Sequence, residues 1–366
     1  MNSTAQFRVF GASPSERRLV RARQLAGDGR SREAEDVYRA VLVEDPGSRT
    51  AWSEYFEWLR AAHRHDDALF LAERAATQFP GEAFALALVG AAQVELGRYR
   101  QGLAALDQAA QADPDLGLVW HEMGYAAWRL GEPSRALLAV DRAFALEPHG
   151  ATLLLRGRIL RDAGRYLAAE VAFTGAMEAA EFAEQRREAE RQISIVRRCA
   201  AFPGRTPATL NATRRWFAET GGAPLTTPDG ASLPTEADLL RAFADLARDE
   251  GWRFTAIHAT DGWPGWQGLA RALSLALVPV TDHAEEIPLI VTRAPSVGGL
   301  RWEMALARLS ETGVGVSFAL SCPSGTSGPD VVGALEGVDH CAVDLAAAQE
   351  AVRHPSSRLA GRRVCC

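Results

Sequence analysis

Residues 29–46 read GRSREAEDVYRAVLVEDP, and residues 131–148 read GEPSRALLAVDRAFALEP. Each stretch opens with glycine, continues with an amphipathic run and closes with proline. The closing prolines recur every 34 residues, so the stretches belong to an internal repeat. Because glycine ends helices and proline cannot continue one, each period predicts two amphipathic helices joined by a short turn. The repeated positions are Pro46, Pro80, Pro114 and Pro148, Gly29, Gly97 and Gly131, the small residues Ala34, Ala68, Gly102 and Ala136, and Trp52 and Trp120.

The repeat resembles the tetratricopeptide repeat (TPR) family over about residues 13–181. The resemblance implies an α-solenoid of TPR helix pairs, in which copies stack because one pair cannot bury its apolar face alone. Two departures stand out. His63 occupies the place of a turn glycine, and the fifth copy starts one residue early at Gly164 and lacks the final proline.

The composition changes twice after the repeats. The stretch EFAEQRREAERQISIVRRCAAF, residues 181–202, predicts a polar capping helix, with interleaved glutamates making its arginines a solvated face. Residues 201–234 are rich in Pro, Gly and Thr around one short helix. We therefore expect a TPR solenoid of about five repeats plus a capping helix over 13–200, a linker over 201–234, and an α/β domain of unknown function over 235–366. The capping-helix arginines are Arg186, Arg187, Arg191, Arg197 and Arg198.

The TPR resemblance implies that the first helix of each pair lines a concave groove. These helices are expected at about 15–27, 49–61, 83–95, 117–129 and 150–162. Arginine binds carboxylates bidentately and aromatic rings supply rigid contact area, so this groove favours a partner protein or acidic peptide with an apolar anchor. The alternative is that Tyr125 and Trp128 pack against neighbouring repeats while the arginines face solvent. The predicted peptide-binding residues are Arg23, Arg60, Phe84, His121, Tyr125, Trp128, Arg129, Arg158 and Arg161, with Glu57 on the same face.

From residue 235 helical and strand patterns alternate, which is typical of an α/β layered domain with a largely parallel sheet. The strands are expected in RFTAIHA, ALVPV, IPLIVTR, VGVSFALS and DHCAVDL. Two points stay open from the pattern alone. IPLIVTR could pair with ALVPV as a hairpin, and DVVGALEG is expected to form a short helix.

Polar residues follow several of these strands, where parallel sheets bind ligands. A thiol needs a nearby base to act as a nucleophile, so Cys322 with His258 or His283 is the candidate catalytic pair. The strings IHATDG and SFALSCPSG are similar to the His and Cys segments of CHAT-type caspase-fold proteases, although Asp261 stands where that family has its catalytic histidine. The alternative is that Cys322 and Cys341 are ordinary strand cysteines.

Composition narrows the function further. All 40 basic residues are arginine, which excludes P-loop, pyridoxal and ordinary kinase chemistry, each of which needs a lysine. The net charge of −6 argues against a nucleic-acid partner. We expect no cofactor, no metal and no membrane insertion. The lysine-free, alanine- and arginine-rich composition favours a bacterial source.

The sequence as a whole predicts a cytoplasmic scaffold or adaptor. The rival is a TPR-targeted enzyme whose α/β domain is a divergent or inactive cysteine protease. The terminal pair Cys365 and Cys366 is either a frayed tail or an exposed reactive pair.

Overall fold

The computed structural model describes residues 14–278, 287–323, 328–338 and 341–364 of the 366. His283, Cys365 and Cys366 lie outside the described residues. The chain divides into two compact units, Met1–Ile159 and Leu160–Cys366. Among the described residues, no helix is long and apolar enough to cross a membrane.

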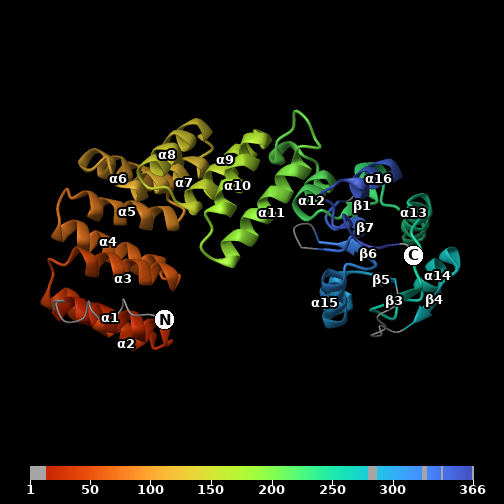
Figure 1. The fold of residues 1–366 in the computed structure, drawn as a ribbon, viewed down its shortest axis with the longest axis horizontal. Coiled ribbons are helices and arrows are strands. Elements are labelled where there is room, and N and C mark those ends of the chain that lie inside the picture. The colour runs from red at the N-terminus through yellow and green to blue at the C-terminus, as the bar shows by residue number, and fades with distance from the viewer. Residues whose placement is uncertain (1–13, 279–286, 324–327, 339–340, 365–366) are drawn as a thin grey trace. The chain divides into compact units, whose positions relative to one another are not determined.

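The first unit is a stack of helix pairs that follow one another in chain order (Figure 1). The first helices of the pairs match the ranges expected from the repeat to within one residue, so the predicted solenoid is confirmed. The helices are α1 (Pro14–Gly27), α2 (Ser31–Glu44), α3 (Arg49–Ala61), α4 (His65–Gln78), α5 (Ala83–Glu95), α6 (Tyr99–Ala112), α7 (Gly117–Arg129), α8 (Pro133–Leu146) and α9 (Gly150–Asp162), the last of which crosses the boundary between the units.

The turn inside each pair needs a left-handed residue. Gly29, Gly97 and Gly131 have φ between 73° and 76°, a region that glycine enters without steric cost. His63, the departure from the pattern, takes the same place with φ 55°. The backbone of this turn therefore keeps its left-handed conformation although His63 replaces glycine, and the histidine is locally strained.

Repeated residues make repeated contacts. Trp52 donates its indole N–H to the carbonyl of Pro46 at 3.0 Å, and Trp120 donates to Pro114 at 2.8 Å. The second helix of a pair crosses closely over the first, since a Cβ added at Gly102 would lie 2.7 Å from the side chain of Val94. The 34-residue period thus specifies packing as well as helix ends.

The second unit begins with three helices and a short turn, which are α10 (Tyr166–Glu178), α11 (Ala183–Cys199), the 3-10 turn η1 (Pro207–Thr209) and α12 (Ala212–Thr220). Helix α11 is the expected capping helix, and Arg198 is the one of its five singled-out arginines that is buried. Arg198 is 5% exposed, donates Nε to the carbonyl of Ala218 and Nη1 to that of Ser356, both at 2.8 Å, and its pKa is lowered to about 10 by burial. The prediction of a solvated face is wrong for Arg198, which joins α11 to the α/β layers.

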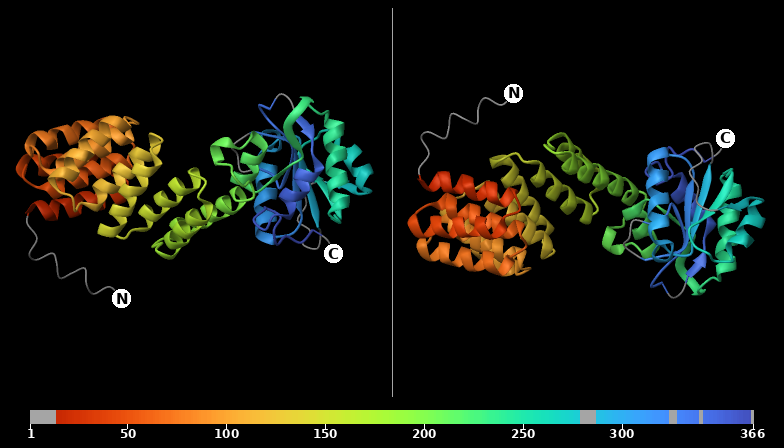
Figure 2. Two further views of the ribbon diagram at one scale, coloured as in Figure 1. Left: turned by 90° about the horizontal axis from the view of Figure 1, so that it is seen from above. Right: turned by 90° about the horizontal axis from the view of Figure 1, so that it is seen from below.

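A six-stranded parallel sheet forms the centre of this unit, in the order β1-β7-β6-β5-β3-β4, with helices on both faces (Figure 2). Helices α13, α14 and α16 cover one face, where the rings of Phe243 and Phe318 stack 4.2 Å apart, and α15 covers the other through Trp302. Strands β2 and β8 form a separate antiparallel pair. The elements are β1 (Ala223–Pro224), β2 (Thr226–Ser232), α13 (Glu236–Asp249), β3 (Ala256–Ala259), α14 (Trp266–Leu273), β4 (Ala276–Val278), β5 (Pro288–Thr292), α15 (Pro295–Thr312), β6 (Val316–Cys322), β7 (Val331–Leu335), β8 (Cys341–Val343) and α16 (Leu345–Arg353).

The largely parallel sheet is confirmed, and two finer expectations are resolved. The hairpin is wrong, because β4 and β5 both pair in parallel with β3. The short helix at DVVGALEG is also wrong: Val331 and Val332 are fully buried in β7, between β1 and β6. The segment 201–234 contributes β1 and β2, and the domain boundaries expected from the sequence stay a prediction.

Candidate functional site

The face formed by the first helices α3, α5, α7 and α9 carries two hollows, and we call it the first-helix face. The first hollow is a cavity of about 120 Å³ between α3, α5 and α7. Its lining includes the small side chains of Ala87 and Ala91 on α5. The larger lining side chains include Phe56 of α3, Phe84 and Leu88 of α5, and Leu118 of α7.

One arginine at the wall of this cavity binds three carboxylates. Arg60 donates Nη2 to Glu95 at 2.6 Å, Nη1 to Glu57 at 3.1 Å, and Nη2 to Glu122 at 3.4 Å. Burial raises the pKa of Glu122 to about 7, against the opposing attraction of Arg60. The cluster therefore exchanges a proton near neutral pH and carries no excess positive charge.

The second hollow is a cavity of about 260 Å³ between α7 and α9, bounded also by the end of α8. His121 lies in its wall, 3.1 Å from the hydroxyl of Thr152. Burial lowers the pKa of His121, and nearby His149 and Arg60 lower it further, so the neutral ring is favoured. Leu118, 53% exposed, lines both cavities.

The structure brings some of the predicted groove residues together. Arg60, Phe84 and Glu57 line the first cavity and His121 lines the second. Sequence reasoning missed Leu118, although its signal was present, because Leu118 is one 34-residue period after Phe84.

The aromatic group on α7 lines neither cavity. Arg129 donates to the hydroxyl of Tyr125 at 2.8 Å and its guanidinium lies 4.8 Å from the ring centroid of Tyr99. The rings of Tyr125 and Trp128 meet edge to face at 5.7 Å and pack against a buried cluster that contains Val140. Such contacts are expected under the alternative in which Tyr125 and Trp128 pack against neighbouring repeats. A role of this aromatic group in binding stays a prediction.

Three arginines of the predicted peptide-binding set remain, namely Arg23, Arg158 and Arg161. Arg23 forms two hydrogen bonds of 3.0 Å with Glu54. Arg158 is half-buried in the first unit, whereas Arg161 belongs to the second, where it bonds to Asp162 and to Gln192 at 2.8 Å.

The candidate catalytic residues lie in the sheet of the second unit. His258 is in β3 and is 3% exposed, and Cys322 is in β6 and fully buried beside Trp216. Strand β5 lies between β3 and β6, and the strand register sets His258 level with Ser317, so Cys322 lies five residues further along β6. Their catalytic pairing stays a prediction, and the rival base His283 lies outside the described residues.

Asp261, at the position of the protease family's histidine, has a different role in this chain. Its carboxylate accepts from the backbone N–H of Arg293 at 2.6 Å, the indole of Trp266 at 2.7 Å and the hydroxyl of Thr292 at 3.1 Å. Burial alone would raise the pKa of Asp261, but the Arg293 N–H and the other donors lower it. Asp261 therefore ties the ends of β3 and β5 together as an ionised carboxylate.

The comparisons with solved structures concern about half of the chain. No family model matches the chain, and no curated protein matches it. Among solved structures it is similar to a thermophilic TPR protein of Thermus thermophilus, at 20% identity over 49% of this chain and 98% of the other, with a TM-score of 0.44. The type IV pilus biogenesis factor PilW gives 20% identity, 53% and 96% coverage, and a TM-score of 0.42.

The APC/C hetero-tetramer Cut9–Hcn1 gives 19% identity and a TM-score of 0.46, covering 52% of this chain and 38% of the other. The fold of about half of this chain is TPR-like. The stacked helix pairs α1 to α8 establish this fold.

Proposed function

We propose that the protein is an interaction scaffold whose first-helix face binds an extended segment of a partner protein. The observation that supports the proposal is the pair of cavities that share Leu118 as a lining residue. Each has an apolar wall and a few polar groups, the usual composition of a recognition pocket. Two apolar side chains of a partner segment would enter the two cavities.

The charges on this face favour apolar anchoring over salt bridges. An acidic peptide, the class predicted from the arginines, would have to displace Glu54 from Arg23, and Glu57, Glu95 or Glu122 from Arg60. Because charge pairs that already exist cancel much of the gain from a new one, acidity alone is a weak source of affinity at these positions. The partner is therefore expected to be selected first by its apolar residues.

Selection from a displayed random peptide library on the full chain tests this proposal, with Leu118→Glu as the blocking variant. Leu118 is half exposed, so the charge is tolerated in the fold but lies in the lining of both cavities. Leu138→Glu is the matched control, since Leu138 on α8 is 72% exposed and lines neither cavity. Selected peptides should carry apolar anchors and lose about tenfold or more in affinity on Leu118→Glu alone. Equal loss on both variants, or on neither, contradicts the proposal.

A further inference from the structure

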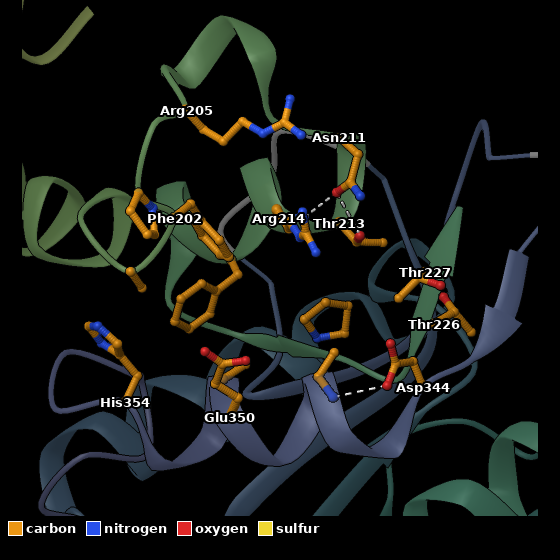
Figure 3. Close-up of a pocket in the computed structure, with 16 residues that line it drawn as sticks. Phe202, Arg205, Asn211, Thr213, Arg214, Thr226, Thr227, Asp344, Glu350 and His354 are labelled. Atoms are coloured by element: carbon orange, nitrogen blue, oxygen red, sulfur yellow. Dashed lines mark hydrogen bonds between the residues drawn. The ribbon is translucent and has the colours of Figure 1, made fainter. Parts of the chain in front are cut away.

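The second unit holds a cavity of about 340 Å³ between α12, α16 and the segment that follows α11 (Figure 3). Its size lies at the lower end of the range for small-molecule sites. Its walls come from three parts of the chain that are remote in sequence. They are residues 201–217, residues 224–227 and residues 344–354.

One wall of this cavity is aromatic. The rings of Phe202 and Phe217 meet edge to face with centroids 6.2 Å apart, and the ring of His354 lies 5.5 Å from that of Phe217. Burial lowers the pKa of His354 and Arg198 lowers it further, against the opposing attraction of Glu350, so the neutral ring is favoured. An apolar group of a ligand would pack on Phe202 and Phe217.

The polar groups divide into two opposite sides, as Figure 3 shows. Arg205 and Arg214 lie on one side of the cavity, and Asp344 and Glu350 lie on the other, along α16. One oxygen of Asp344 accepts the backbone N–H of Ala347 at 3.0 Å, which fixes the carboxylate at the helix start. The other oxygen is available to a ligand donor.

The two arginines of this cavity are outside the ion pairs of the described fold. Within the described residues neither forms an ion pair, and the guanidinium of Arg214 lies 5.7 Å from the ring centroid of Phe202. Glu350 likewise forms no ion pair with any described residue, whereas Arg353 one turn away binds Glu250 at 2.9 Å. The cavity thus presents two positive and two negative side chains across an apolar wall, with no net charge.

We propose that this cavity binds a small zwitterion with an apolar side group, of the class of the aliphatic and aromatic amino acids. The carboxylate would bind Arg214, with Arg205 beside it, because guanidinium and carboxylate form paired hydrogen bonds. The ammonium group would bind Glu350 or Asp344, and the side group would lie on Phe202 and Phe217. A simple anion would satisfy only one side of the cavity and leave the carboxylates unmatched.

Isothermal titration of the full chain tests the proposal with L-phenylalanine and L-leucine as probes. Phenylpropionate lacks the ammonium group and phenylethylamine lacks the carboxylate, so the pair tests each side of the cavity separately. Saturable binding of at least one amino acid is expected, with a loss of about tenfold or more for each truncated compound. Tight binding of phenylpropionate would overturn the zwitterion assignment, and failure of both amino acids to bind would overturn the site.

Substitutions of cavity residues test whether the amino acid binds in this cavity. Arg214→Gln and Glu350→Gln should each weaken amino-acid binding about tenfold or more. The matched controls are Arg271→Gln on α14 and Glu219→Gln on α12, both exposed and outside the cavity lining. Binding that survives Arg214→Gln and Glu350→Gln, or that falls equally in the controls, would place the ligand elsewhere and overturn the proposal.

Discussion

The arginines at the cavities of the two units differ in whether carboxylates of the fold bind them. In the first unit Arg60 is surrounded by Glu57, Glu95 and Glu122, whereas in the second unit Arg214 lies against an aromatic ring with no carboxylate of the described chain bound to it. A charge that is matched inside the fold contributes to stability, and a charge left unmatched beside a cavity is available to a ligand. The contrast predicts that the two residues respond differently to the same substitution.

The largest effect is expected from Arg60→Gln. Removing the guanidinium leaves Glu122 buried among carboxylates, and breaking a largely buried pair costs about 2–3 kcal/mol of unfolding free energy. Urea unfolding at pH 8 measures the loss. Arg135→Gln is the control, because the Arg135–Asp107 pair is about two-fifths exposed and is expected to contribute less than about 1 kcal/mol. Equal losses in the two variants would remove the distinction between the Arg60 cluster and a surface ion pair.

Glu122→Gln should alter the pH dependence of the same unfolding reaction. The folded pKa of about 7 lies above the ordinary value of 4.5, so the folded state binds the extra proton. That contribution to stability is complete below about pH 4.5 and is lost as the pH rises through 7. The variant should therefore match the wild type near pH 4 and exceed it at pH 8, by on the order of 1–3 kcal/mol. Exposed Glu73→Gln serves as control, and a constant difference across the pH range would contradict the assignment.

The fold of a unit can be predicted from the sequence to the extent that its contacts are local in the chain. The solenoid was predictable because its contacts are local and recur every 34 residues, which makes Gly97 and Gly131 evidence for one another. Strand β7 was not, because a five-residue apolar run fits a strand or a helix and only its neighbours β1 and β6 decide. Leu118 could have been found by the period. Glu122 has a counterpart in Glu54, two periods earlier, but the burial and raised pKa of Glu122 depend on its neighbours in the stack.

The cavity of the second unit could not be predicted at all. Phe202, Pro224 and Asp344 come from a supposed linker, a two-residue strand and the start of the last helix. No pattern in the sequence relates these positions, since their proximity follows from the pairing of β1 with β7 and the packing of α16 on β1. A cavity whose lining residues are brought together by such tertiary contacts can be recognised only from the folded structure.

His63→Gly tests the one turn that departs from the repeat. A residue with a side chain at φ 55° is strained by about 1 kcal/mol relative to glycine, although glycine also increases the entropy of the unfolded chain. We expect a net gain of about 0.5–1 kcal/mol in unfolding free energy, measured by urea unfolding. Ala62→Gly is the control, because Ala62 has an ordinary φ of −82° and should only lose stability. A loss in His63→Gly as large as that in Ala62→Gly would show that the left-handed turn is not strained.

The smallest effect should come from Arg214→Gln, and its size decides whether the contrast with Arg60 holds. Arg214 is exposed, and within the described residues its side chain has a ring contact but no carboxylate to leave behind, so the substitution should change the unfolding free energy by less than about 0.5 kcal/mol. The same variant is expected to lose ligand binding, which separates a binding role from a structural one. A destabilisation similar to that of Arg60→Gln would mean that Arg214 is matched within the fold after all. Its charge would then be unavailable to a ligand, and the cavity of the second unit would resemble that of the first.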